Sequence, residues 1–104
     1  MTETTADEWL ASEAEELLEM GPVGLYEFLW SLDGSPFKLG ADEARAAARR
    51  VVAGLVREGV AELRAVVWPT NQPVSDALPL SALDDDGSWA EGPRFVALVA
   101  AERF

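Results

Sequence analysis

The sequence predicts a single domain of the α+β class, with three main helices and a small antiparallel sheet of two or three strands. Residues 41–58 carry apolar side chains at helical spacing. A glycine separates this helix from residues 60–68, where apolar and polar side chains alternate as in a strand with one buried face. Residues 95–101 are apolar throughout, which is typical of a strand covered on both faces. The length of 104 residues suits one domain with one core.

The first expected element is a helix over residues 7–20, where apolar side chains recur at helical spacing. Thr5 and Glu8 match the capping-box pattern at its start. Residues 1–6 are polar, and we expect them to be frayed because such termini have nothing to bury. Gly21 ends the helix.

A second helix is expected over residues 22–32, which are apolar around most of the helical circumference. We interpret Tyr26, Phe28 and Trp30 as core-packing residues of this helix, with a ligand pocket as the alternative. After a turn, residues 37–39 could form a very short strand.

The helix over 41–58 and the strand over 60–68 are the best-marked pair of elements. Acidic residues in the first turn of the helix suit the positive end of its dipole. Gly59 can adopt the left-handed conformation that closes a helix. In the strand, the side chains of Glu62 and Arg64 should lie on the face opposite the core.

Residues 69–94 are expected to form a long loop with one helical turn at 81–85, which Trp89 should anchor onto the body of the domain. This loop carries three consecutive acids, Asp84, Asp85 and Asp86. Such a cluster suggests a weak site for a hard cation, but the flanking residues do not complete a calcium-binding loop. We therefore interpret the segment as solvated, and we expect no metal.

The last strand, residues 95–101, has a second apolar face that includes Val96 and Leu98. The helix over 7–20 could cover this face. Otherwise the face would be exposed, and an exposed apolar patch of this kind marks an interaction site.

The composition excludes several classes of function. The sequence contains no histidine and no cysteine, so disulfides, thiolate nucleophiles, imidazole bases and ordinary zinc sites are excluded. No nucleophile–base pair is apparent, and we expect neither an enzyme nor a cofactor. The N-terminus has no basic region, and no apolar run is long enough to span a membrane, so we expect a cytosolic protein.

The net charge of −11 is unevenly distributed along the chain. Residues 1–37 hold nine acidic residues and no basic one, whereas residues 38–64 hold six basic and four acidic ones. The exposed side of the first helix contains Glu13, Glu15, Glu16 and Glu19. Such a surface can simply be solvated, or it can attract a basic partner.

The order helix, short strand, helix, strand, long loop, strand resembles a winged-helix domain, in which the last strand lies between the other two. The run from Ala44-Arg45 to Leu55-Val56-Arg57-Glu58-Gly59-Val60 resembles the final helix of such a domain entering its wing. The resemblance covers Val23–Ala101, but the sequence leaves room for one helix where winged-helix DNA binders usually have two.

The winged-helix resemblance implies that basic residues near the 41–58 helix would contact nucleic acid. These residues are Lys38, Arg45, Arg49, Arg50, Arg57 and Arg64. The charge balance opposes this function, because nucleic-acid binders usually carry a net basic face. Arginines on an exposed helix face also commonly pair with nearby acids of the same chain.

In size, charge and layout, the sequence also resembles the small, acidic, cysteine-free immunity proteins of bacterial polymorphic-toxin and contact-dependent growth inhibition systems. This resemblance implies a non-catalytic protein that binds a basic toxin domain in the cytosol and blocks it. The partner-binding residues would be Glu13, Glu15, Glu16, Glu19, Asp84, Asp85, Asp86, Val96 and Leu98. A helper or assembly protein is a further alternative, and the sequence does not determine the oligomeric state.

Overall fold

The computed structural model describes residues 5–70 and 72–101, and within them the chain forms three α-helices and a four-stranded sheet. The α+β class is therefore confirmed, although the sheet has more strands than the two or three expected. In chain order the elements are α1 (Ala6–Met20), β1 (Val23–Gly24), α2 (Leu25–Asp33), α3 (Ala41–Arg57), β2 (Ala61–Val67), β3 (Gln72–Pro73), the 3₁₀-helices η1 (Leu80–Asp84) and η2 (Asp86–Trp89), and β4 (Arg94–Ala100).

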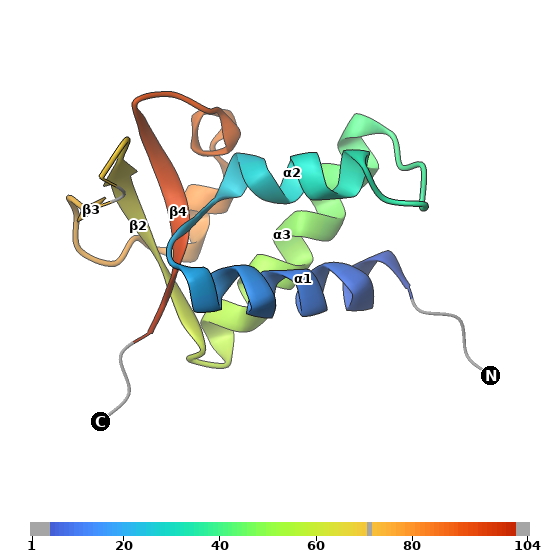
Figure 1. Ribbon diagram of the computed structural model, residues 1–104, viewed down its shortest axis with the longest axis horizontal. Helices are drawn as coiled ribbons and strands as arrows, with labels where there is room; N and C mark the ends of the chain where they lie inside the picture. The colour runs from blue at the N-terminus through green and yellow to red at the C-terminus, as the bar shows by residue number, and fades with distance from the viewer. Residues whose placement is uncertain (1–4, 71, 102–104) are drawn as a thin grey trace.

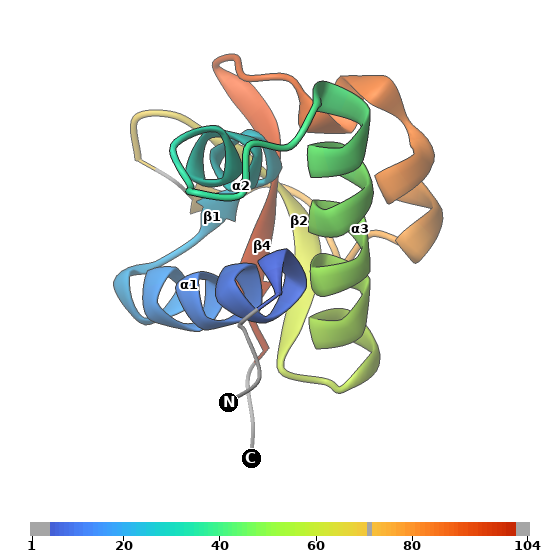
Figure 2. The same ribbon diagram turned by 90° about the vertical axis from the view of Figure 1, so that its right-hand side faces the viewer.

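The sheet has the strand order β1-β4-β2-β3, and each neighbouring pair is antiparallel. The last strand, β4, thus lies between β1 and β2, in agreement with its apolar sequence. Figure 1 shows the sheet at one end of the molecule, with the helices extending from it. Seen from the helical side in Figure 2, α3 runs beside β2, while α1 and α2 lie next to each other.

The main core lies between the helices and one face of the sheet. Leu63 of β2 and Leu98 of β4 are direct partners in the sheet, and both are completely buried. The helices cover them with apolar side chains, including Leu10, Phe28 and Val52. The opposite face of the sheet carries a second, smaller apolar cluster of Val66, Phe95 and Ala97, against which Tyr26 and Val99 pack.

The start of α1 confirms the capping box. The Glu8 N–H donates to Thr5 Oγ1 at 3.1 Å, and the Thr5 N–H donates back to Glu8 Oε1 at 3.5 Å. Two backbone donors at the helix start are thereby satisfied. The expectation that residues 1–6 are frayed is wrong for Thr5 and Ala6, which belong to this capped helix start. Residues 1–4 lie outside the described part of the chain.

The helix expected over 22–32 begins later, at Leu25, because the residues before it pair with β4. Val23 is opposite Leu98 and Gly24 is opposite Ala97, which makes this pair the first strand. The short strand expected at 37–39 is absent from the described structure: Lys38 has a φ of 52°, in the left-handed region that no strand uses.

The position of β1 changes the order of elements. Because β1 precedes α2, both α2 and α3 lie between the first strand and β2. The expectation of a single helix in that interval was wrong, since it rested on the strand at 37–39.

The junction between α3 and β2 agrees with the sequence. Gly59 adopts a φ of 75°, and its N–H donates to the Val56 carbonyl at 3.1 Å. The next N–H, from Val60, donates to the Leu55 carbonyl at 3.1 Å. This pair of bonds is the Schellman arrangement, which satisfies carbonyls at the end of a helix.

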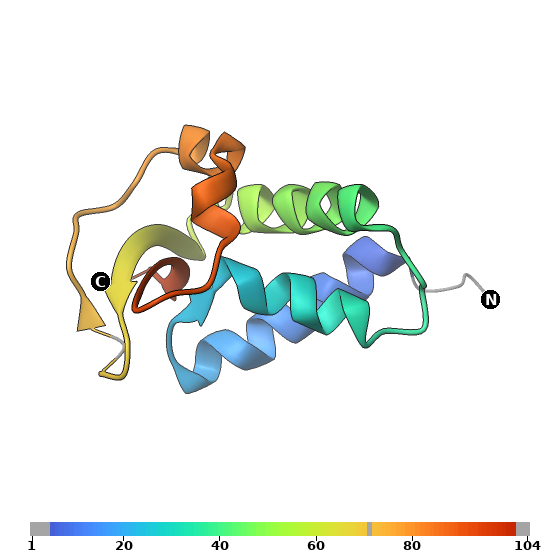
Figure 3. The same ribbon diagram turned by 90° about the horizontal axis from the view of Figure 1, so that it is seen from above.

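The long 69–94 loop is more structured than expected. It contains the edge strand β3. The helical turn predicted at 81–85 is confirmed as η1, which begins one residue earlier, and a second 3₁₀-helix, η2, follows it. Seen from above in Figure 3, these short helices lie beside α3, which η1 contacts. Trp89 is only 5% exposed and belongs to the main core, so its predicted role as the anchor of this loop is confirmed.

Candidate functional site

Three of the four arginines of α3 form ion pairs with acids that are distant in sequence. Arg49 Nε lies 2.8 Å from Asp84 Oδ1, and Arg45 Nη1 pairs with Asp86 Oδ1. At the other side of the helix, Arg50 binds Asp7 through two hydrogen bonds of 2.8 and 3.0 Å. The interpretation of these arginines as partners of nearby acids is confirmed for these three residues.

The Arg50–Asp7 pair joins α3 to the first turn of α1. The hydrogen bond from Arg50 lowers the pKa of the Asp7 carboxyl from its usual value, and partial burial opposes this shift. In return, the carboxylate raises the pKa of the Arg50 guanidinium. Both groups are therefore held in their charged forms at neutral pH.

The three consecutive loop acids point to different partners. Asp84 and Asp86 pair with arginines of α3, whereas Asp85 Oδ1 accepts a hydrogen bond from the Gly87 N–H at 2.9 Å. They do not converge, and no group of three acidic side chains in residues 5–70 and 72–101 is placed to hold a metal ion. Asp84 and Asp86 thus neutralise the charges of Arg49 and Arg45 on α3.

The remaining basic residues of the nucleic-acid hypothesis lie apart from one another. Arg64 belongs to β2, where it contacts Glu62 at 3.3 Å and the Ser75 carbonyl at 3.1 Å. Lys38 follows α2, Arg57 ends α3, and neither forms an ion pair with a described residue. The described structure therefore brings Arg45, Arg49 and Arg50 to carboxylates rather than to one shared basic groove.

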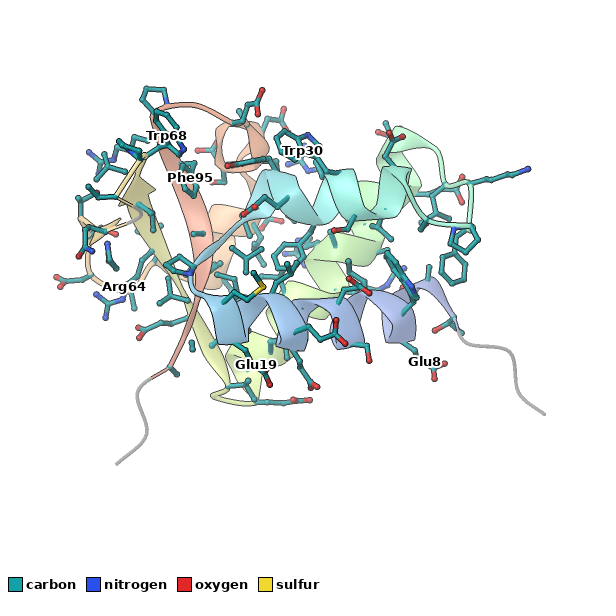
Figure 4. All side chains as sticks on the ribbon, viewed as in Figure 1. Glu8, Glu19, Trp30, Arg64, Trp68 and Phe95 are labelled. Carbon is teal, nitrogen blue, oxygen red and sulfur yellow. The ribbon has the colours of Figure 1, made fainter. Side chains whose placement is uncertain are left out.

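The exposed side of α1 is an acidic surface. Glu8, Glu15 and Glu19 follow one another at helical spacing, with Glu16 beside them. All four are exposed, Glu13 is partly buried at the flank, and none of these glutamates forms an ion pair with a described residue. Figure 4 shows Glu8 and Glu19 on the outer side of α1.

The apolar residues proposed for partner binding are covered within the domain. Leu98 is 0% exposed, and Val96 is partly buried against the same core. Helix α1 contacts β4 on this face. This confirms the alternative in which the first helix covers the second apolar face of the last strand. The expectation that Leu98 contributes to a docking surface is therefore wrong for the folded chain.

An aromatic groove lies on another part of the surface, between α2 and the ends of β2 and β4. It has a volume of about 730 Å³ and is lined by Tyr26, Trp30, Trp68, Glu91, Gly92 and Pro93. Trp30 is 59% exposed and Trp68 is 65% exposed. In Figure 4 both tryptophans lie near Phe95, on the side of the molecule opposite Glu8 and Glu19.

The walls of the groove are held in place by contacts below them. Tyr26 packs edge-on against Trp30, with ring centroids 4.9 Å apart, and against Phe95 at 5.4 Å. A Cβ atom on Gly24 would lie 2.5 Å from the Tyr26 ring, so glycine allows Tyr26 to occupy this place. The backbone N–H of Trp68 donates to the Pro93 carbonyl at 2.9 Å, which continues the pairing of Val67 with Arg94 and joins the end of β2 to the start of β4.

The electrostatic surroundings of the groove are acidic. Burial raises the pKa of the Tyr26 hydroxyl, and the charges of Glu27 and Glu91 raise it further. Glu27 is engaged in capping α2, where its Oε2 accepts a hydrogen bond from the Gly24 N–H at 2.6 Å. Glu91 is exposed and has no hydrogen-bond or ion-pair partner among the described residues.

The interpretation of all three α2 aromatics as core residues was wrong for Trp30. Phe28 is completely buried and shares a helix face with Leu25 and Leu32, whereas Tyr26 and Trp30 follow a separate i, i+4 line. That second line was visible in the sequence. The contribution of Trp68 was not, because it depends on how β2 ends against Pro93.

The described residues include no helix long and apolar enough to cross a lipid bilayer. Comparison with known proteins gave no match to a family model, to a curated protein sequence or to a solved structure.

Proposed function

We propose that this protein is a non-catalytic protein-binding module that holds a basic partner through the acidic face of α1. One observation carries the proposal: Glu8, Glu15, Glu16 and Glu19 form no ion pair with a described residue, whereas Asp7, Asp84 and Asp86 are paired with arginines. The most specific form of this function is that of an immunity protein, which would bind and neutralise a bacterial toxin domain in the cytosol.

The acidic face has a physical cost that a partner would remove. Like charges at i, i+3 and i, i+4 destabilise a helix by a few tenths of a kcal/mol for each pair. A basic surface docked on α1 would relieve this repulsion. Charge complementarity of this kind also accelerates encounter and disfavours wrong partners.

A non-catalytic role also fits the available side chains. The sequence contains no histidine or cysteine, and the loop carboxylates engage three different partners instead of facing a common point. General acid–base or nucleophilic catalysis requires groups that converge on one reacting atom.

The immunity role can be tested by genetic rescue. The chain is used as bait under native conditions, and the captured protein is expressed in a bacterial host with and without it. We expect a protein that arrests growth alone and is tolerated when the chain is co-expressed. A captured partner that is harmless, or whose toxicity persists despite binding, would contradict this role.

The contribution of α1 can be tested by association kinetics with the captured partner. Exchanging Glu15→Lys and Glu19→Lys should lower the association rate constant by about ten-fold at low salt, because steering depends on the local field. The matched control is Asp33→Lys with Asp76→Lys, two exposed acids elsewhere. Equal losses in both variants would show that net charge acts, rather than the α1 face.

A winged-helix DNA-binding protein is the second candidate, and the order of elements favours it. Two helices lie between β1 and β2, and β4 lies between those strands. The pairing of Arg45, Arg49 and Arg50 with carboxylates speaks against it. Fluorescence anisotropy with duplex DNA at low salt decides: a phosphate binder shows affinity that falls steeply as salt rises.

A further inference from the structure

The aromatic groove lies apart from the acidic face of α1, so a ligand bound there would be distinct from a partner bound to α1. We infer that this groove, defined by Tyr26, Trp30, Trp68, Glu91, Gly92 and Pro93, binds an arginine side chain presented by an extended segment of a protein partner. This surface is additional to α1, as their placement in Figure 4 shows, so the inference stands or falls separately from the proposed function.

The exposure of the two tryptophans is the first argument. Trp30 and Trp68 keep more than half of their surface in contact with solvent, although tryptophan is normally highly buried. Tryptophan and tyrosine are also the residues most enriched among those that dominate protein–protein binding energies. Edge contacts with Trp30 and Phe95 hold the Tyr26 ring in place, so this part of the wall exists before a ligand arrives.

Charge is the second argument. No basic side chain is among the described residues that line the groove; Arg94 follows Pro93 in the chain but does not line it. Glu91 lies at the groove without an ion-pair partner in the described residues. Aromatic faces attract cations through their quadrupole, and a carboxylate beside them supplies an anion to pair with.

A tryptophan and a carboxylate also occur together elsewhere in this protein, where an arginine contacts both of them. Arg45 lies over the Trp89 ring, 5.7 Å from its centroid, and pairs with Asp86 at the same time. The groove presents tryptophan and a carboxylate without the arginine. A guanidinium from another molecule would complete the arrangement there, as Arg45 does beside Trp89.

The shape of the groove favours a segment of polypeptide over a small cation. Small-molecule sites enclose most of their ligand, whereas the two tryptophans here remain largely open to solvent. A planar guanidinium can stack on an open aromatic wall and still bind a carboxylate through its edge, and lysine lacks this geometry. The flanking backbone of the partner would extend along the rest of the groove.

The inference can be tested by NMR titration of the purified chain. The probe is a capped Gly-Gly-Arg-Gly-Gly peptide, compared with the same peptide carrying lysine or citrulline, the uncharged analogue of arginine. The indole N–H signals, assigned through single Trp→Phe variants, report each tryptophan. We expect saturable shifts at Trp30 and Trp68, with Trp9 and Trp89 unaffected. Binding should be weaker for lysine and undetectable for citrulline.

Variants locate the site. Glu91→Gln should weaken arginine-peptide binding by roughly five-fold, because it removes the paired charge and keeps the shape. Asp76→Asn, the matched control at an exposed acid outside the groove, should leave binding unchanged, as should Glu15→Lys with Glu19→Lys on α1.

Three outcomes would overturn the inference. They are the absence of saturable shifts at Trp30 and Trp68, equal binding of the citrulline or lysine peptide, and loss of binding on reversal of the α1 charges. Glu91 is exposed and has no hydrogen-bond or ion-pair partner among the described residues, so weaker binding by Glu91→Gln cannot be attributed to a folding defect.

Discussion

The surroundings of Trp89 and those of Trp30 and Trp68 use similar chemistry with different outcomes. Around Trp89, the chain supplies every group: Arg45 over the ring, Asp86 for the guanidinium, and the Leu83 carbonyl, which accepts from Nε1–H at 2.9 Å. At the groove, Glu91 carries the only charge among the described residues that line it, and none of these residues is a cation. A cluster that the chain completes serves the fold, whereas one left incomplete is available for binding.

The largest expected difference between these regions is in stability. Trp89→Ala should lower the free energy of unfolding by about 3–5 kcal/mol, because it leaves a cavity and an unpaired carbonyl beneath the loop. Trp68→Ala removes the same side chain from a site that is 65% exposed, and should change stability by less than about 1 kcal/mol. Urea unfolding of both variants measures this. Similar losses would show that Trp68 is part of the core.

The second prediction tests whether the groove is preformed. Gly24→Ala places a Cβ atom against the Tyr26 ring, and the ring or β1 must move to accommodate it. We expect a loss of about 1–3 kcal/mol, as is usual for overpacking, together with weaker binding of the arginine peptide. Gly54→Ala is the control, since a Cβ atom there meets nothing within 4 Å. Full peptide affinity in Gly24→Ala would show that Tyr26 need not hold this position.

The charged groups beside Trp89 and at the groove should differ in their contribution to stability. Arg45→Met removes a cation from the Trp89 ring and from Asp86, and should cost about 1 kcal/mol in unfolding experiments. Glu91→Gln removes a charge that has no partner in the described chain, so stability should stay the same or rise slightly. A clear loss of stability in Glu91→Gln would reveal an internal role for this carboxylate.

The sequence predicted the parts of the fold that depend on local patterns. The capping box at Thr5, the apolar stripe of α3, the left-handed Gly59 and the central place of β4 are all confirmed. It did not predict β1, because a two-residue strand is defined only by its pairing with β4. Phe-Lys-Leu at 37–39 looked like a strand, yet Phe37 instead packs on Trp9, with ring centroids 6.0 Å apart.

The two candidate binding surfaces were predictable only where they depend on local spacing. The acidic face of α1 follows from helical spacing, and the sequence identified Glu15, Glu16 and Glu19; Glu13, which it also placed there, is partly buried. The ion pairs of Arg45, Arg49 and Arg50 join residues separated by 35 to 43 positions, so which acids are paired depends on tertiary structure. The groove likewise combines α2 with the ends of β2 and β4.

The smallest expected effect concerns the Arg50–Asp7 ion pair, which joins α1 to α3. Arg50 lowers the pKa of Asp7 in the folded state, so this pair stabilises the fold above the unfolded pKa of about 4. The contribution disappears as the pH falls through the lower, folded pKa. Asp7→Asn should therefore lower the urea midpoint slightly at pH 7, and the difference from the natural sequence should vanish toward pH 2. Arg50 is exposed and Asp7 is partly exposed, so added salt should reduce the difference as well. A difference that persists at pH 2 would mean that the asparagine disturbs the first turn of α1 rather than a charge interaction.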